Sequence, residues 1–265
     1  MVKNQWVFKK LYKNKLQGQV WIVENQFGQR GYFKFTTPRQ WYYSGPMIAD
    51  ELIAAALAKE LGLPVANLDL AVVRGPTGAP QKGLVSVGVS AKEVITWEEA
   101  KKIHHNPNEH VNNANLLCSI VVFDAWIVNI DRALGRNLVL YRNNPADKFD
   151  WYLIDHGHTL HDSPHKWKRG EWKSRHWERL WRFHSVPKGF LNLGFSREKL
   201  EPMINKIENL PPSAIDQAIK KAPRKYLNPR GRLFIKGLLL YRQKKIRTII
   251  TRWLNYKGKK EFGRS

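Results

Sequence analysis

Cysteine, long apolar runs and acidic residues are all scarce in this sequence. Cys118 is the only cysteine among 265 residues, so no internal disulfide can form, and we expect a cytoplasmic protein rather than a secreted one. No apolar run reaches the roughly 18 residues that a membrane-spanning helix needs. The N-terminal segment has neither the apolar centre nor the small-residue cleavage site of a secretory signal peptide.

The shortage of acidic residues leaves a large positive charge. Lysine and arginine number 45 against 22 aspartate and glutamate residues, which gives a formal net charge of +23. Such a chain attracts polyanions such as RNA, DNA or anionic lipid through its basic surface. Because the basic residues are spread along the sequence, this charge favours association with any anion and selects none of them.

The hydrophobic patterns divide the chain into a strand-rich first third and a mainly helical remainder. Short β-prone runs occupy residues 19–23, 31–35, 66–73 and 83–89. Among them, residues 46–61 have the composition of one helix, for which Ser44 or Gly45 is the expected cap. Thr96 and Glu99 have the spacing of a capping box and predict the start of another helix.

The second part of the chain begins with a segment, residues 110–130, that is apolar on almost every side and is therefore predicted to be a buried helix. Two strands are predicted next, at residues 137–141 and 151–154. Three helices follow, at residues 196–210, 213–222 and 231–254. This order predicts an α+β protein with a small β-rich N-lobe that holds one main helix (residues 1–90) and a larger helical C-lobe (residues 91–265).

Polar residues interrupt the apolar pattern where the buried helix meets the first of these two strands. Asp131 and Asn137 lie in the interruption, and Asp155 follows the second strand. Because an antiparallel strand pair returns the chain to its starting edge, we expect these three side chains to converge. Phosphoryl transfer uses such a set: one carboxylate orients or deprotonates the attacking hydroxyl, while an amide oxygen and a second carboxylate hold magnesium. Gly157 would let the backbone turn sharply after Asp155.

A charged pair is predicted in the first lobe. Alternation along "GYFKF" puts Phe33 and Phe35 on one face of a strand and Lys34 on the other. On the following helix, Glu51 falls among small apolar residues, where a carboxylate needs a partner to keep its charge. Lys34 is the expected partner. An arginine elsewhere, or Asp50 in place of Glu51, are the alternatives.

The motifs resemble those of a known family. "NIDRALGRNLVLY" followed by "WYLIDHGHTL" is similar to the catalytic and metal-binding loops of HipA-like kinases and, more distantly, of phosphatidylinositol kinases. "RGYFKF" resembles the strand that carries the phosphate-binding lysine, and "ADELIAAALAKELGLPV" resembles the helix that carries its glutamate partner. The resemblance covers roughly residues 18–255 and implies a two-lobed protein-kinase-like fold.

The resemblance also implies an activity, namely ATP- and magnesium-dependent transfer of a phosphoryl group to a serine or threonine hydroxyl of a protein. Asp131 would be the catalytic base or orienting group, and Asn137 and Asp155 would bind the metal. Lys34 would hold the phosphates of ATP and would be steadied by Glu51. An acidic or nucleic-acid-associated acceptor would suit the basic surface. Some family members belong to toxin–antitoxin pairs, and the sequence leaves that open here.

Two departures from the protein-kinase pattern keep alternatives open. Asn137 stands six residues after Asp131 instead of five, so the extra residue either bulges near Gly135 or displaces Asn137. In the segment "KNKLQGQVW" before the lysine strand, Gly18 is the single glycine, and it would form either a phosphate-cradling turn or an ordinary β-turn. The alternatives are a catalytically weak or inactive kinase-like scaffold that binds RNA or another polyanion, and a lipid or small-molecule kinase.

Three further signals favour structural roles. The histidines of "DHGHTLHDSPH" are more typical of loop hydrogen bonding than of a zinc site, because zinc-site spacing is lacking. "HKWKRGEWKSRHWERLWRF" is typical of tryptophans that anchor a polar segment, with base stacking as the alternative. Asp124, inside the apolar helix, is expected to orient a backbone turn or Arg132.

Overall fold

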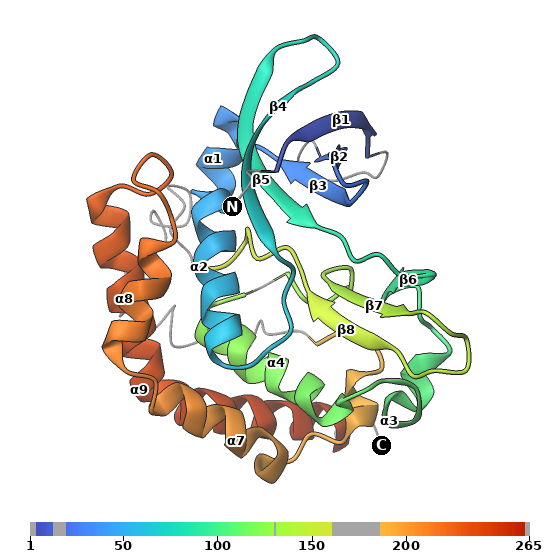
Figure 1. Ribbon diagram of the computed structural model, residues 1–265. Coiled ribbons are helices and arrows are strands. Elements are labelled where there is room, and N and C mark those ends of the chain that lie inside the picture. The colour runs from blue at the N-terminus through green and yellow to red at the C-terminus, as the bar shows by residue number, and fades with distance from the viewer. Residues whose placement is uncertain (1–3, 13–19, 130, 161–185, 263–265) are drawn as a thin grey trace.

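The computed structural model describes residues 4–12, 20–129, 131–160 and 186–262. Its N-terminal part is an antiparallel sheet of five strands in the order β1-β2-β3-β5-β4 (Figure 1). Their bounds are β1 Trp6–Leu11, β2 Val20–Asn25, β3 Arg30–Lys34, β4 Leu68–Arg74 and β5 Pro80–Val87. The strands predicted from the sequence are present, and β1 and its pairing with β2 are additional.

One face of this sheet carries its own apolar core. Phe33 is fully buried there among Trp6, Trp21 and Val85. Phe35 packs against the same cluster, as the alternation predicts. Strands β3 and β5 approach closely at Gly83, where an added Cβ would lie 2.2 Å from the carbonyl oxygen of Lys34. Lys34 therefore projects from the opposite face, at the end of a strand that core packing holds in place.

Two helices separate β3 from β4. They are α1, Pro38–Ser44, and α2, Met47–Glu60. The expectation that Ser44 caps α2 is wrong, because Ser44 ends α1. Pro46 occupies the N-cap position of α2 without a side-chain hydrogen bond, and Gly45 turns the chain between the helices with a φ of 77°.

The second part of the chain combines a small sheet with helices. The sheet has the order β6-β7-β8 and consists of β6 Glu93–Thr96, β7 Leu138–Arg142 and β8 Asp150–Leu153. The helical elements are η1 Ile103–His105, α3 Pro107–His110, α4 Ala114–Trp126, η3 Phe190–Leu193, α7 Arg197–Glu208, α8 Pro212–Lys220 and α9 Pro229–Phe262. Together with the curled N-terminal sheet they confirm the α+β fold class.

The helix predicted after Thr96 is wrong, although its capping box forms. The Thr96 backbone N–H donates to Glu99 Oε2 at 2.7 Å, and the Glu99 N–H donates to Thr96 Oγ1 at 3.4 Å. The chain then makes only turns and the short 3₁₀ segment η1. Buried Trp97 stacks on His104 and meets Phe190 edge to face, so packing overrides the local helix signal.

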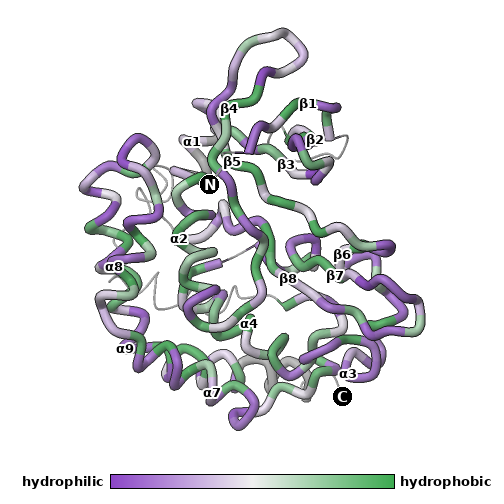
Figure 2. The backbone as a smooth tube through the Cα atoms, in the orientation of Figure 1, coloured by the Kyte–Doolittle hydropathy of each residue, from purple (hydrophilic) through white to green (hydrophobic). Residues whose placement is uncertain are grey.

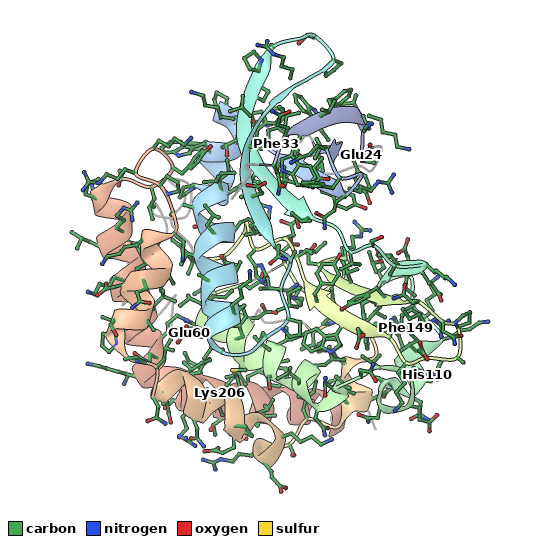
Figure 3. All side chains as sticks on the ribbon, viewed as in Figure 1. Glu24, Phe33, Glu60, His110, Phe149 and Lys206 are labelled. Carbon is green, nitrogen blue, oxygen red and sulfur yellow. The ribbon has the colours of Figure 1, made fainter. Side chains whose placement is uncertain are left out.

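Helix α2 is packed into the same core as the C-terminal helices. Its Ala49, Ile53 and Leu57 belong to one buried cluster with residues of α4, α7, α8 and α9. At its C-terminal end, Lys206 of α7 donates to the Leu61 carbonyl at 3.1 Å, and Figure 3 shows Lys206 below Glu60. Within the described residues, no helix is both long and apolar enough to span a membrane.

Candidate active site

The end of α4 is the framework of the candidate site. The Asp124 carboxylate is buried and accepts hydrogen bonds from Asn129 Nδ2 at 2.8 Å and from Arg132 Nε at 2.9 Å. The Arg132 guanidinium also donates to the Asn137 carbonyl. The prediction that Asp124 orients Arg132 is therefore confirmed. This buried pair ties the helix end to both sides of the polar loop.

Asp131 and Asn137 lie next to each other in this loop. The Asp131 N–H donates to Asn129 Oδ1 at 3.0 Å, and the Asp131 side chain is exposed to solvent. Asn137 Nδ2 donates to the Asp131 carbonyl at 3.0 Å and to Asp131 Oδ2 at 3.3 Å. A turn closed by the hydrogen bond from Gly135 N–H to the Arg132 carbonyl at 3.0 Å absorbs the extra residue. This turn lies near Gly135, where the bulge alternative expects it, and Asn137 keeps its contact with Asp131.

Asp155 is brought to the same place by the β7–β8 hairpin. The Ile154 N–H donates to the Asn137 carbonyl at 3.2 Å, so Asp155 follows the residue that pairs with Asn137. The backbone at Asp155 is left-handed, with a φ of 56°. The sharp turn expected at Gly157 thus occurs at Asp155. Left-handed backbone at a non-glycine residue is typical of constrained functional sites.

Lys34 connects Asp155 to α2. Its Nζ lies 3.0 Å from Glu51 Oε1 and 2.8 Å from Asp155 Oδ1. The predicted ion pair between Lys34 and Glu51 is confirmed, and Glu51, not the neighbouring Asp50, makes it. Asp155 was expected near Asn137, but its direct contact with Lys34 was not predicted from the sequence.

His156 is the residue of the site that the sequence reasoning underestimated. Its backbone N–H donates to Glu51 Oε2 at 2.8 Å, and its ring lies 3.3 Å from the Arg132 guanidinium. The side chain is buried and meets Phe123 edge to face. His156 therefore links α2 to the Asp124–Arg132 pair. Its position directly after the strand end that supplies Asp155 was the available signal.

Burial and charge act against each other on these groups. Burial tends to raise the pKa of Asp155, but the Lys34 ammonium outweighs it and holds that pKa below its usual value. Burial, together with the charge of Asp155, raises the pKa of Glu51 despite the Lys34 ammonium. For Lys34, burial tends to lower the pKa, but Asp155 and Glu51 together raise it, so the ammonium stays charged. Burial, followed by the charge of Arg132, lowers the pKa of His156 and keeps its ring neutral.

The oxygen atoms here fit a magnesium ion better than zinc. In the part of the chain that the structure describes, no three His, Cys, Asp or Glu side chains are grouped as metal ligands. Magnesium needs fewer protein ligands than zinc. One or two protein oxygens are enough, because the phosphates of a nucleotide and water complete its coordination. The Asp155 carboxylate, 30% exposed, and the Asn137 amide oxygen are donors of the required kind.

Some predicted features lie outside the described residues. They are Gly18 in the proposed phosphate turn, the histidines at 161 and 165, and the segment rich in tryptophan and basic residues over 165–183.

Comparison with known proteins identifies the family and the fold of the chain. The sequence model of the HipA-like kinase family matches residues 43–225, which is more than half of the chain. No curated protein matches the sequence. Among solved structures, the Helicobacter pylori proinflammatory kinase CtkA superposes with a TM-score of 0.62 at 15% identity, over 95% of this chain and 98% of that one. At such identity the likeness shows the protein-kinase-like fold and not the substrate.

Two further structures cover most of this chain with lower scores. A Golgi casein kinase has a TM-score of 0.48 at 12% identity, over 96% of this chain and 75% of that one. HipA of Shewanella oneidensis, solved with HipB and its operator DNA, has a TM-score of 0.42 at 14% identity, over 93% of this chain and 63% of that one.

Proposed function

Because the chain belongs to the HipA-like kinase family, we propose that it transfers the γ-phosphoryl group of ATP to a serine or threonine hydroxyl of a protein. One observation carries this proposal. Lys34 Nζ lies between Glu51 and Asp155, at 3.0 and 2.8 Å, while Asn137 bonds to Asp131 on the adjoining loop. Phosphoryl transfer requires a cation, two oxygen ligands and an exposed carboxylate, and all of them lie on one side of this fold.

Each of these residues has a role in the proposal. Lys34 binds the phosphates, and Glu51 fixes its position from α2. Asp131 accepts the proton of the attacking hydroxyl or orients that group, as its exposed side chain allows. The hydroxyl oxygen forms a bond to the γ-phosphorus as the bond to the bridging oxygen breaks, and the leaving group is ADP. Positioning and charge neutralisation account for most of the rate enhancement.

Asn137 and Asp155 are the residues that would hold magnesium. When bound, the metal neutralises the charge of the phosphates during transfer. The hydrogen bond from Asn137 Nδ2 to Asp131 directs the amide nitrogen away and leaves the amide oxygen as the ligand atom. The left-handed backbone at Asp155 and its ion pair with Lys34 fix the direction of the carboxylate.

The remaining assignments follow from charge and core packing. We place the enzyme in the cytoplasm, with an acidic or nucleic-acid-associated acceptor that its net charge of +23 attracts. We also propose that the chain divides into an N-lobe (residues 1–90) and a C-lobe (91–265). Helix α2 belongs to the N-lobe but packs into the core of the C-lobe. The hydrogen bond from Asn137 to Asp131 favours an active enzyme over the non-catalytic polyanion-binding scaffold.

The proposal is tested by incubating the purified chain with γ-labelled ATP and magnesium, alone and with cell extract. We expect label on protein as phosphoserine or phosphothreonine, and its loss when magnesium is chelated. Label that partitions into organic solvent would assign the enzyme to lipids instead. Absence of nucleotide binding, together with salt-sensitive binding of RNA, would overturn the proposal and support the scaffold.

A further inference from the structure

A cavity of about 310 Å³ lies where the start of α2 approaches the connection between α8 and α9. Figure 1 shows this connection reaching up beside α1. The cavity is lined by Trp41, Pro46 and Ile48 of the α1–α2 region, by Lys82 of β5, and by Lys225 and Tyr226 of the connection. None of these residues belongs to the proposed catalytic set.

The lining combines an apolar wall with cations. Pro46 and Ile48 supply apolar surface, and the side chain of Trp41 is 50% exposed, which is unusual for such a large ring. Lys225 Nζ lies 4.7 Å from the centre of the Tyr226 ring. The cavity therefore suits a large apolar side chain whose neighbours are negatively charged.

The positive charge continues beyond the cavity along the α8–α9 connection. Lys220, Lys221 and Arg224 are exposed there, and the sequence has no acidic residue between Asp216 and Glu261. Figure 2 shows this connection as hydrophilic. In the described part of the chain, none of these three residues forms an ion pair, and neither does Lys82. Among the described residues, therefore, no carboxylate is paired with this strip.

We propose that the cavity and the basic connection form a docking site for an acidic segment of a partner protein. One large apolar side chain of that segment sits between Trp41 and Tyr226, and its flanking carboxylates meet Lys82, Lys225 and the strip beyond. The basic strip extends past the cavity, so an extended chain fits it better than a small anion. Single-stranded nucleic acid would use successive stacking rings, whereas the cavity offers one strongly exposed ring.

The site adjoins α2, because Pro46 is the N-cap of this helix and Ile48 lies on it, ahead of Glu51. A docked segment would therefore contact the element that positions the Lys34 ion pair. Docking itself needs neither ATP nor transfer, so it can be measured whether or not the proposed activity holds.

The test measures the fluorescence anisotropy of a fluorescein-labelled peptide as the whole chain is added. The peptide has ten residues, Asp and Glu around one central Phe. We expect saturable binding that weakens about tenfold or more in Trp41→Ala, because exposed aromatic anchors dominate such contacts. A peptide with Ala in place of Phe should bind weakly to every variant. The double variant Lys82→Glu/Lys225→Glu should lose binding to the same extent as Trp41→Ala.

The control is Lys244→Glu/Lys245→Glu, which makes the same change in net charge at exposed positions of α9. Binding close to that of the unmodified chain is expected there. Equal weakening in both double variants would overturn the proposal and reduce the effect to net charge. Absence of peptide binding would also overturn it. Tighter binding of a single-stranded oligonucleotide that depends on Trp41 would assign this face to nucleic acid instead.

Discussion

Lys34 is the residue on which the candidate site depends most. Its ammonium is largely withdrawn from water and stays charged because two carboxylates, on α2 and after β8, neutralise it. The sequence predicted one of them, since a glutamate among alanines on a buried helix face requires a cation. It could not predict the contact with Asp155, because that distance depends on how the hairpin lies against the sheet.

Glu51→Gln is the residue-scale test of this arrangement. The substitution keeps an oxygen to accept the His156 N–H but removes the charge opposite Lys34. We expect transfer to fall by about 10²-fold, because a misplaced phosphate-binding group loses orientation. Steady-state kinetics with ATP as the varied substrate measures this. The control is Glu60→Gln, an exposed residue of the same helix, and an equal effect in both variants would contradict the assignment.

At the scale of elements, the end of α4 decides where the loop residues stand. The sequence predicted a buried helix as far as residue 130, but α4 ends at Trp126. The reason is the backbone after Trp126: Val128 is left-handed, with a φ of 58°, and the Asn129 N–H donates to the Asp124 carbonyl at 2.8 Å, which closes the helix end. Arg242 of α9 donates to the Ala125 and Trp126 carbonyls, a distant contact that no local pattern predicts.

Asp124→Ala tests this framework. Removing the carboxylate leaves the Arg132 guanidinium buried without its ion-pair partner, which costs about 3–5 kcal/mol in typical cases. We expect a loss of this size in the free energy of unfolding, measured by urea titration. Asp147→Ala, in the exposed β7–β8 turn, should change stability by less than about 0.5 kcal/mol. A loss below about 1 kcal/mol for Asp124→Ala would show that the pair does not hold the loop.

At the scale of the whole molecule, α2 joins the two parts of the chain. The order of strands and helices predicted the α+β class and the two lobes, because periodicity records which faces are buried. It could not show that α2 packs into the helical core beside α8, since pairing between distant elements leaves no local signature. The short elements β1, α1 and β6 were also missed, because brief segments carry little periodicity.

This shared core predicts cooperative unfolding. Because Leu57 of α2 is fully buried among residues of the C-terminal helices, we expect one urea transition that coincides in tryptophan fluorescence and far-ultraviolet circular dichroism. Leu57→Ala should shift that whole transition by about 2–5 kcal/mol. Two separated transitions, of which the substitution moves only one, would show that the lobes unfold independently.

Phosphoryl transfer by Asp155→Asn tests the central claim most directly. The substitution keeps the size of the side chain and removes the charge that faces Lys34 and would bind magnesium. The control is Asp150→Asn, an exposed residue of β8. We predict that Asp155→Asn abolishes transfer from labelled ATP while its circular dichroism spectrum matches that of the unmodified chain, and that Asp150→Asn stays active. A folded Asp155→Asn variant with full activity would contradict the account.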